Sequence, residues 1–446
     1  ISKISRFDKL NDIEDGERKY QKWHYGPQER LSQSLKLNKK LNNVIADDLS
    51  IVGSWQKTNE SRHKQKNNEA LTSNRYEDIL IFDGILDMKK TIHKIKLNYG
   101  MSFRKQHVTS TADLTNNDGE AFFNTTRYPD GGSEITDGAV YAQIKWDLSK
   151  KTTLFFGERY NVNSLNAQFN NNNIINLPYN EIVTENNALV SSFQIQQKIT
   201  DKLSTSYSYY MGYRNPNIDD IGKIFSKNDL DVVIPNNNLR PEKTNNQEYT
   251  LTYNAKKLKL EFQYFITNLK DAIQRSNSSL NGIDSIVYDG ETMRIQMNQN
   301  IESARINGVS IGASIINIKT LSLDLIYNYL HGENSSNLPL SHIPPANLKL
   351  SFSKKLNKNE VGLTYIYNAW KNKNDYDNNG VDNLDEATID GNPSWQTFNM
   401  NYTSRINNNL ILSFSLENVL DTHYKTFGSG ISASGRNFVV SLTSKF

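Results

Sequence analysis

The chain has no cysteine among its 446 residues, and it has no long apolar run. The absence of cysteine excludes a disulfide framework and a thiolate metal site. No stretch approaches the roughly 18 to 20 consecutive apolar residues that a membrane helix requires, so any crossing of a membrane would have to be made by strands. The net charge is only +3, and lysine and arginine are scattered rather than arranged in stripes. This distribution gives no indication of nucleic-acid binding.

The common catalytic signatures are also missing. The sequence contains no G-x-S-x-G, no H-E-x-x-H and no glycine-rich phosphate loop, and it has no basic and aromatic strip suited to single-stranded nucleic acid. Acidic residues and histidines in polar stretches do not single out a catalytic pair. We therefore expect a protein that is not an enzyme.

Aromatic residues are abundant, although the mean hydropathy is low. The chain has 23 tyrosines and 18 phenylalanines, with a mean hydropathy of -0.65. A membrane barrel fits both values, because only every second strand residue must be apolar and polar loops lower the average.

Apolar and polar residues alternate over most of the chain. Near the C-terminus, Leu410, Leu412, Phe414 and Leu416 share one parity, which is the two-residue period of a strand with one apolar face. About seventeen such segments are expected, at residues 28–38, 43–58, 76–88, 92–106, 138–148, 152–165, 186–199, 203–214, 243–254, 257–274, 292–318, 320–331, 345–356, 359–370, 395–406, 409–420 and 435–446.

The connections between these segments alternate in length. Every second one is short, at residues 39–42, 89–91, 149–151, 200–202, 255–256, 357–358 and 407–408, whereas the others are long and polar, such as 105–137, 167–185, 215–242, 275–291 and 371–394. Short turns at one end and long loops at the other are typical of an up-and-down outer-membrane barrel. A Greek-key sandwich would not keep this alternation. We therefore predict an all-β, transmembrane, antiparallel up-and-down β-barrel.

The number of strands makes the predicted barrel incomplete. Bacterial single-chain barrels have even strand numbers, and 22-stranded ones are transporters with a plugged lumen. About seventeen of an expected 22 strands leave five missing at the N-terminus, and seventeen alone should not close. The chain starts at Ile1 without methionine or a signal-like segment, so we expect a mature or truncated piece that forms one partial barrel domain over residues 1–446.

Several stretches resemble one known family in the order in which they occur. They are Tyr213–Lys223 and Asn238–Glu242, which are similar to strand-end "FRAPN" and "NPDLKPE" boxes, together with Ser303–Val309, His342–Pro345, Glu417–Asp421 and Gly435–Phe438. In this order, over more than half of the chain, they resemble a TonB-dependent outer-membrane receptor of the kind common in Bacteroidetes. Pro216 would end a strand by removing a hydrogen-bond donor, so the boxes themselves are expected to be mainly architecture of the barrel rim.

The resemblance implies a bacterial outer-membrane receptor with an N-terminal plug. Such a receptor binds a scarce solute outside the cell, for example a ferric siderophore, haem or cobalamin, and a TonB complex pulls on the plug to drive uptake. It implies a small iron- or cobalt-containing ligand as cargo rather than cofactor, contact with lipid and lipopolysaccharide, and a monomer. Since we expect the plug to be missing, this piece alone should not carry out driven transport. Two alternatives remain open at this point: a secreted or surface all-β adhesin, and a passive porin.

One loop carries a calcium-like pattern. Residues 375–386 fit D-x-[DN]-x-[DN]-G-x5-E, in which alternate oxygens surround Ca²⁺ and glycine permits a sharp turn. The predicted ligands are Asp375, Asp377, Asn379, the carbonyl of Val381 and Glu386. The alternative is an acidic, soluble loop, because no helices flank it and Asp382 replaces the usual apolar residue.

Histidines and basic side chains are candidates for ligand binding in the outer loops. A haem receptor would be expected to have a histidine between the two boxes, but none lies between Asn217 and Leu239. The remaining candidates for haem or metal are His24, His63, His107, His331 and His342. Basic residues that could attract an anionic chelate, or alternatively lipopolysaccharide, are Arg62, Lys64, Lys66, Arg75 and Arg104.

Overall fold

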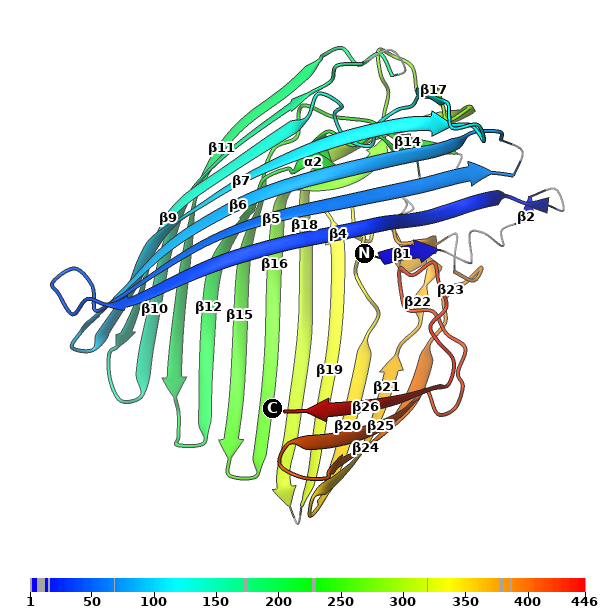
Figure 1. Ribbon diagram of the computed structural model, residues 1–446. Helices are drawn as coiled ribbons and strands as arrows, with labels where there is room; N and C mark the ends of the chain where they lie inside the picture. The colour runs from blue at the N-terminus through cyan, green and yellow to red at the C-terminus, as the bar shows by residue number, and fades with distance from the viewer. Residues whose placement is uncertain are drawn as a thin grey trace.

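The computed structural model describes residues 2–5, 13–14, 17–67, 69–171, 175–226, 230–318, 320–377, 381–384 and 387–445. Seventeen long strands form one continuous, strongly curved antiparallel sheet (Figure 1). They are β4 (Tyr20–Lys40), β5 (Asp48–Lys66), β6 (Thr72–Ile92), β7 (Ile95–Thr115), β9 (Ser133–Asp147), β10 (Thr152–Gln168), β11 (Glu181–Lys198), β12 (Leu203–Arg214), β15 (Glu242–Ala255), β16 (Leu258–Asn277), β18 (Glu291–Ile318), β19 (Leu321–Asn334), β20 (Asn347–Leu356), β21 (Asn359–Asn368), β24 (Trp395–Arg405), β25 (Leu410–Glu417) and β26 (Asn437–Ser444). Each pairs with the next, which confirms the predicted up-and-down fold.

Several short elements lie at the long-loop end of the sheet. They are β1 (Ser2–Ser5), β2 (Ile13–Glu14), β3 (Glu17–Arg18), β8 (Ala121–Phe123), β13 (Phe225–Ser226), β14 (Asp231–Val233), β17 (Ser285–Tyr288), β22 (Lys371–Asn372), β23 (Gly391–Asn392), the helix α2 (Ile218–Ile221) and the 3-10 turn η1 (Lys373–Asp375). Five of them extend the main sheet to 22 strands in total, but these five are two to four residues long and do not cross the barrel.

The predicted boundaries are wrong at the long-loop end. The strand expected at 92–106 continues to Thr115, and the one expected at 28–38 begins at Tyr20. Beyond the membrane the outer face of a strand no longer contacts lipid, so the backbone ladder continues although the strict apolar alternation has stopped. The turn between β4 and β5 is also longer than predicted, because the Asn43 side chain accepts hydrogen bonds from the amides of Ile45 and Ala46, both at 2.9 Å, and holds a local turn.

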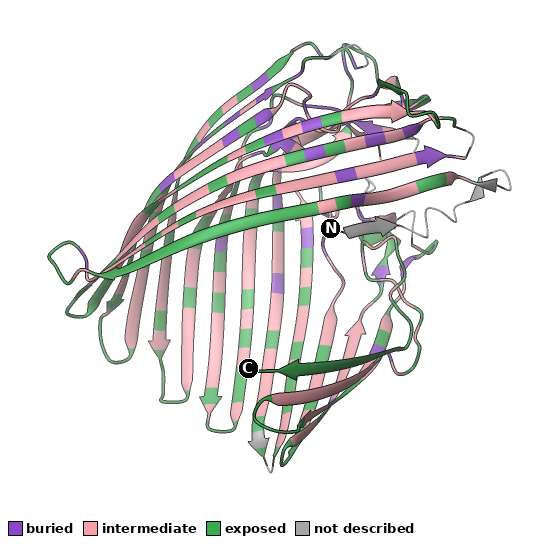
Figure 2. Cartoon of the chain, viewed as in Figure 1, coloured by how far each residue is buried: buried purple, intermediate pink, exposed green. Residues whose placement is uncertain are grey.

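The two faces of the sheet differ as the alternation predicts. Large apolar side chains of one parity are exposed, for example Phe82 at 46%, Phe103 at 49% and Phe156 at 41% (Figure 2). The opposite parity carries polar residues such as Asp83 and Arg104, which pair with each other at 2.6 Å on the inner wall. The exposed apolar side chains meet no second sheet in the part of the chain that the structure describes, which argues against a sandwich. Within the same part, no helix is long and apolar enough to cross a membrane.

The two end strands, β4 and β26, are unlike the others. All eight residues of β26 and residues 31–40 of β4 are exposed, on both faces. Among the described strand pairs, no register connects β4 with β26, and Figure 1 shows them apart. The proposal that further strands complete the ring stays a prediction.

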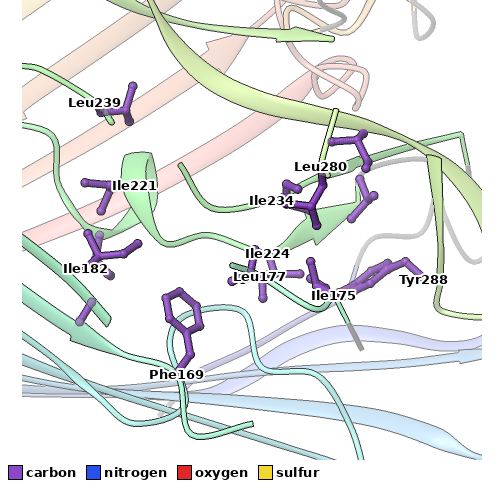
Figure 3. Packing of buried hydrophobic residues seen from close by; sticks show 14 of the residues in the cluster. Phe169, Ile175, Leu177, Ile182, Ile221, Ile224, Ile234, Leu239, Leu280 and Tyr288 are labelled. Atoms are coloured by element: carbon purple, nitrogen blue, oxygen red, sulfur yellow. The ribbon is translucent and has the colours of Figure 1, made fainter. Parts of the chain in front are cut away.

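The largest hydrophobic core lies in the mouth of the barrel, where loops fold inward. We call the described residues within 169–180, 215–241 and 278–290, which leave out 172–174 and 227–229, the loop cap. Its apolar side chains, including Ile221, Ile234 and Phe169, pack together (Figure 3) and against the upper inner wall at Val108 and Leu165. These two wall residues are buried, at 2% and 0% exposure. The inner face therefore changes from polar to apolar where the cap begins.

Candidate ligand-binding site beneath and within the loop cap

The box-like stretch at Tyr213–Lys223 forms the base of the cap. β12 ends at Arg214, and Asn217 caps α2 by accepting a hydrogen bond from the amide of Asp220, while Asp220 accepts one from the amide of Asn217. The guanidinium of Arg214 lies 2.6 Å from Asp220 and also contacts Glu242, the first residue of β15. This ion-paired corner ties both ends of the loop 215–241 to one point on the rim.

The second box-like stretch is held in a similar way. Arg240 forms an ion pair with Asp271 at 2.6 Å, and its amide donates to the side chain of Asn300 at 2.8 Å. Both stretches thus have the architectural role that the sequence predicted for them.

A cavity of about 530 Å³ lies beneath this corner, on the inner wall. Arg104 and Arg214, which line it, are paired with carboxylates. Arg159 has neutral partners instead, namely Ser102 at 2.9 Å, Asn161 at 2.7 Å and the ring of Tyr141 at 5.3 Å. No described carboxylate lies within ion-pair distance of Arg159. Its charge is therefore available to an anionic group in the cavity.

Three cations from the cap and the segments beside it lie near the carboxylate of Asp219. We call Arg127, Lys223 and Arg275 the basic cluster. Lys223 lies 3.0 Å and Arg127 lies 3.6 Å from Asp219. Both cations also lie over the ring of Phe225, at 4.8 Å for Arg127 and 4.9 Å for Lys223.

Arg275 is the least compensated member of the basic cluster. Its Nε is buried without a hydrogen-bond partner, and none of the ion pairs between described residues includes it. It interacts electrostatically with three carboxylates, Asp219, Asp377 and Asp231, and with the cation Arg127. A buried donor without a partner is costly, so the geometry favours a bound anion that would accept from it.

The pKa values of Asp219 and its neighbours are shifted by burial and by the charges close to them. Burial, followed by repulsion from Arg127, holds the pKa of Lys223 below its ordinary value. Burial also acts to raise the pKa of Asp219, but the attraction of Lys223 and the hydrogen bond from Tyr128 at 2.8 Å outweigh it, so that its pKa is lowered. The pKa of Tyr128 itself is raised by burial to about 12. Asp219 is therefore ionised at neutral pH and holds two cations in place.

Acid is expected to loosen the cap through Asp219. Because its folded pKa lies below the ordinary 3.8, ionised Asp219 stabilises the cap above about pH 4, and this contribution is lost as the pH falls through the folded value. Since the chain has no cysteine, a spin label at Leu230→Cys, an exposed cap position, would report the change as increased mobility below pH 4. Asp219→Asn should make the label mobile already at pH 7. An immobile label in that variant would contradict the prediction.

The basic residues predicted from sequence have other roles. Arg62 pairs with Glu77 at 2.5 Å, and Lys66 pairs with Glu291 at 3.4 Å. Lys64 and Arg75 both pair with Asp289, at 3.6 and 3.4 Å, and so fasten β17 to the inner wall. Their charges are locally balanced. The members of the basic cluster were missed because they lie in three segments distant in sequence, and only the fold brings them together.

Two of the five predicted histidines lie together. His24 on β4 and His63 on β5 are directly opposite, with ring centroids 4.7 Å apart. His63 also contacts Asn74 at 2.7 Å. The other three are separate: His107 lies 3.3 Å from Thr109, His331 lies 3.3 Å from Glu333, and His342 lies 2.8 Å from Asp382. A role for any of them in binding stays a prediction.

The structure describes only part of the predicted calcium site. Asn379 and Glu386 lie outside the described residues, whereas Asp375 ends η1 and Asp377 and Val381 follow it. Among the described side chains no group of three or more histidines or carboxylates is arranged to hold a metal. The buried Asp382, which breaks the pattern, pairs with the ring of His342. It also accepts a hydrogen bond of 2.9 Å from the backbone amide of His342. Burial raises the pKa of Asp382. Calcium binding stays a prediction.

Comparison with known proteins identifies the family. A family model described as "TonB dependent receptor-like, beta-barrel" matches residues 4–419. The chain belongs to this family. TonB-dependent receptor barrels are proteins of the bacterial outer membrane, so the predicted localisation is confirmed.

Individual relatives are distant in sequence. The "Heme/hemopexin utilization protein C" of Haemophilus influenzae (strain 86-028NP) is 25% identical over 283 residues, which cover 59% of this chain and 38% of the relative. The solved structure "Copper transporter OprC" superimposes with a TM-score of 0.78 at 16% identity, over 96% of this chain and 66% of that one. A double mutant of the hemophore receptor HasR of Serratia marcescens, in complex with its hemophore HasA and heme, superimposes with a TM-score of 0.70 at 14% identity. The match covers 95% of this chain and 68% of that one. This TonB-dependent receptor barrel thus spans about two fifths of the curated relative, and the structural likeness shows the fold.

Proposed function

We propose that the chain is the barrel of a receptor that takes up a scarce solute across the outer membrane, with a ferric siderophore, haem or cobalamin as cargo. The observation that carries this proposal is the loop cap, a folded and charged structure set in the mouth of a family barrel. A passive porin would need an open lumen, and an adhesin would have no use for a cavity beneath the cap.

The energy for uptake would come from outside this barrel. We propose that a TonB complex acts through a plug domain of the full-length receptor, and that the whole resembles the receptors of Bacteroidetes. The polarity of the inner wall supports the proposal of a plug. Polar and charged side chains such as Arg159, Asn161 and Asp137 lie around a cavity there. Such a wall can exchange hydrogen bonds with a polar domain.

The charge of the cap favours an anionic cargo. The basic cluster contains Arg275, which forms no ion pair with any described residue and has a buried Nε without a hydrogen-bond partner, and Arg159 offers a further cation deeper in the lumen. Haem and many iron chelates carry carboxylates or ionised oxygens, which accept charge-assisted hydrogen bonds from arginine and lysine. The name of the curated relative, a heme/hemopexin utilization protein, makes haem the first ligand to test.

The test uses the full-length receptor in iron-starved cells that lack other uptake systems. Growth on haem, on a ferric siderophore or on cobalamin as the limiting nutrient, dependent on both the receptor and a functional TonB complex, would support the proposal. Growth that persists without the TonB complex would indicate a porin. If none of the three nutrients supports growth although the receptor is present in the outer membrane, this choice of cargo is overturned.

A further inference from the structure

Positive charge is concentrated at the short-turn end of the barrel. The short connections and their flanking residues comprise residues 36–50, 87–97, 145–154, 196–205, 253–261, 316–323, 352–361, 403–412 and 442–446. These stretches contain 21 lysines and arginines but only 7 aspartates and glutamates, whereas the whole chain has 51 and 48. The remainder of the chain is therefore acidic, and the barrel is polarised along its axis. Figure 1 shows the short turns gathered at one end, opposite the cap.

Many of these lysines are exposed and form no ion pair within the part of the chain that the structure describes. Lys40, Lys90, Lys145 and Lys259 form ion pairs at this end. A further group is exposed, and none of its members has an ion pair with any other residue that the structure describes. This group consists of Lys94, Lys150, Lys151, Lys202, Lys256, Lys257 and Lys358. Their positive field is not cancelled locally.

The lysines border the apolar band directly. Leu37, Ile92, Leu148 and Leu356 lie within a few residues of them and are 57%, 52%, 45% and 47% exposed. In the turn 41–47, Val44 is 94% exposed. Apolar side chains with lysines immediately beyond them are typical of the level at which lipid headgroups lie, because the lysine stem stays with the hydrocarbon and the ammonium reaches the interface.

A cavity lies within this basic end. It has a volume of about 560 Å³ and is lined by Lys94, Lys145, Lys150, Lys151 and Lys198 together with a single carboxylate, Asp147. Asp147 is 3.6 Å from Lys145, which leaves four ammonium groups around the cavity. Its strand residues Lys145, Asp147 and Lys198 have the parity of the inner wall, opposite to the exposed Phe156, so the cavity faces the lumen and adds to the positive charge of this end.

We propose that the short-turn end of the barrel binds anionic phospholipid headgroups of the periplasmic leaflet, with phosphates held by exposed turn lysines such as Lys94, Lys150 and Lys151. This inference rests on the proposed placement of the barrel in the membrane. Basic residues beside a membrane-spanning element attract anionic lipid by roughly fivefold for each lysine that reaches the surface. The interaction would also define which end of the barrel lies in the phospholipid leaflet.

The experiment measures which lipids stay with the protein. The barrel is reconstituted into vesicles of phosphatidylethanolamine and phosphatidylglycerol in equal amounts, flotation verifies its insertion, and the retained lipids are quantified after mild detergent extraction. We expect phosphatidylglycerol to be enriched at least about twofold in the retained lipid. The triple variant Lys94→Gln, Lys150→Gln, Lys151→Gln should lower the enrichment towards one.

A matched control has the same change of charge at the other end. Lys243, Lys270 and Lys373 are exposed residues at the cap end, and their replacement by glutamine should leave the enrichment intact. The proposal would be overturned if both triple variants lost the enrichment equally. It would also be overturned if the lipid retained by the unmodified barrel had the same ratio of phosphatidylglycerol to phosphatidylethanolamine as the vesicles. Tight binding to purified peptidoglycan without enrichment of phosphatidylglycerol would overturn it too. Failure of flotation would instead count against the membrane placement itself.

Discussion

Replacing Lys223 and Arg275 together by glutamine is expected to weaken haem binding by roughly 100-fold. Two charge-assisted hydrogen bonds to a carboxylate would be lost, and each contributes about 1.5 to 3 kcal/mol. The cap itself should persist, because its apolar core does not include these side chains. Titration of the purified full-length receptor with haem, followed by its absorbance, measures the effect.

The control for this prediction keeps the change of charge but moves it away from the basic cluster. Lys243 and Lys270 are exposed on adjacent strands at the same end of the barrel and are direct partners in the β15 and β16 register. Lys243→Gln with Lys270→Gln should change haem affinity less than about threefold, because exposed charges are screened. Equal losses in both double variants would show that the basic cluster is not the binding site.

Replacing Arg62 by alanine is expected to destabilise the outer halves of β5 and β6 by about 3 kcal/mol. Its partner Glu77 is only 1% exposed, and one of its carboxylate oxygens has no hydrogen-bond partner even with Arg62 in place. Removal of the guanidinium would therefore leave a buried carboxylate without its ion-pair partner. Hydrogen exchange of the paired amides between β5 and β6 would report the loss as faster exchange, of roughly 100-fold, near these two residues.

A double-mutant cycle distinguishes this cause from lost packing. Adding Glu77→Gln to Arg62→Ala removes the buried charge and should recover most of the protection. If the double variant exchanges as fast as Arg62→Ala alone, the packing of the arginine stem rather than the uncompensated carboxylate explains the loss.

The strands were predictable from sequence because a membrane barrel enforces strict alternation. Lipid accepts only apolar side chains on one face, so a segment such as Leu203–Arg214 has the same boundaries in the sequence pattern and in the structure. The turn end is well predicted because its connections are short. Outside the membrane this constraint weakens, and the strand that passes His107 continues to Thr115 although one of its faces is no longer required to be apolar throughout.

The candidate site was much less predictable. The loop cap consists of apolar residues spread through long polar loops, and Ile221 and Ile234 carry no periodic signal. The basic cluster depends on two loops and the strand β16 meeting near Asp219. The pairing of His24 with His63 depends on an irregularity in the register between Tyr25 and Glu29, which shifts β4 against β5. Such contacts between distant segments are determined by the assembled fold and not by local pattern.

The parallel pairing of β14 with β18 joins two loops into one body. Asp231–Val233 lies along Arg294–Gln296, and the amide of Ile234 donates to the carbonyl of Gln296 at 2.9 Å. Because β18 continues from there to the opposite end of the barrel, a push on this loop is transmitted to a strand that spans the whole wall.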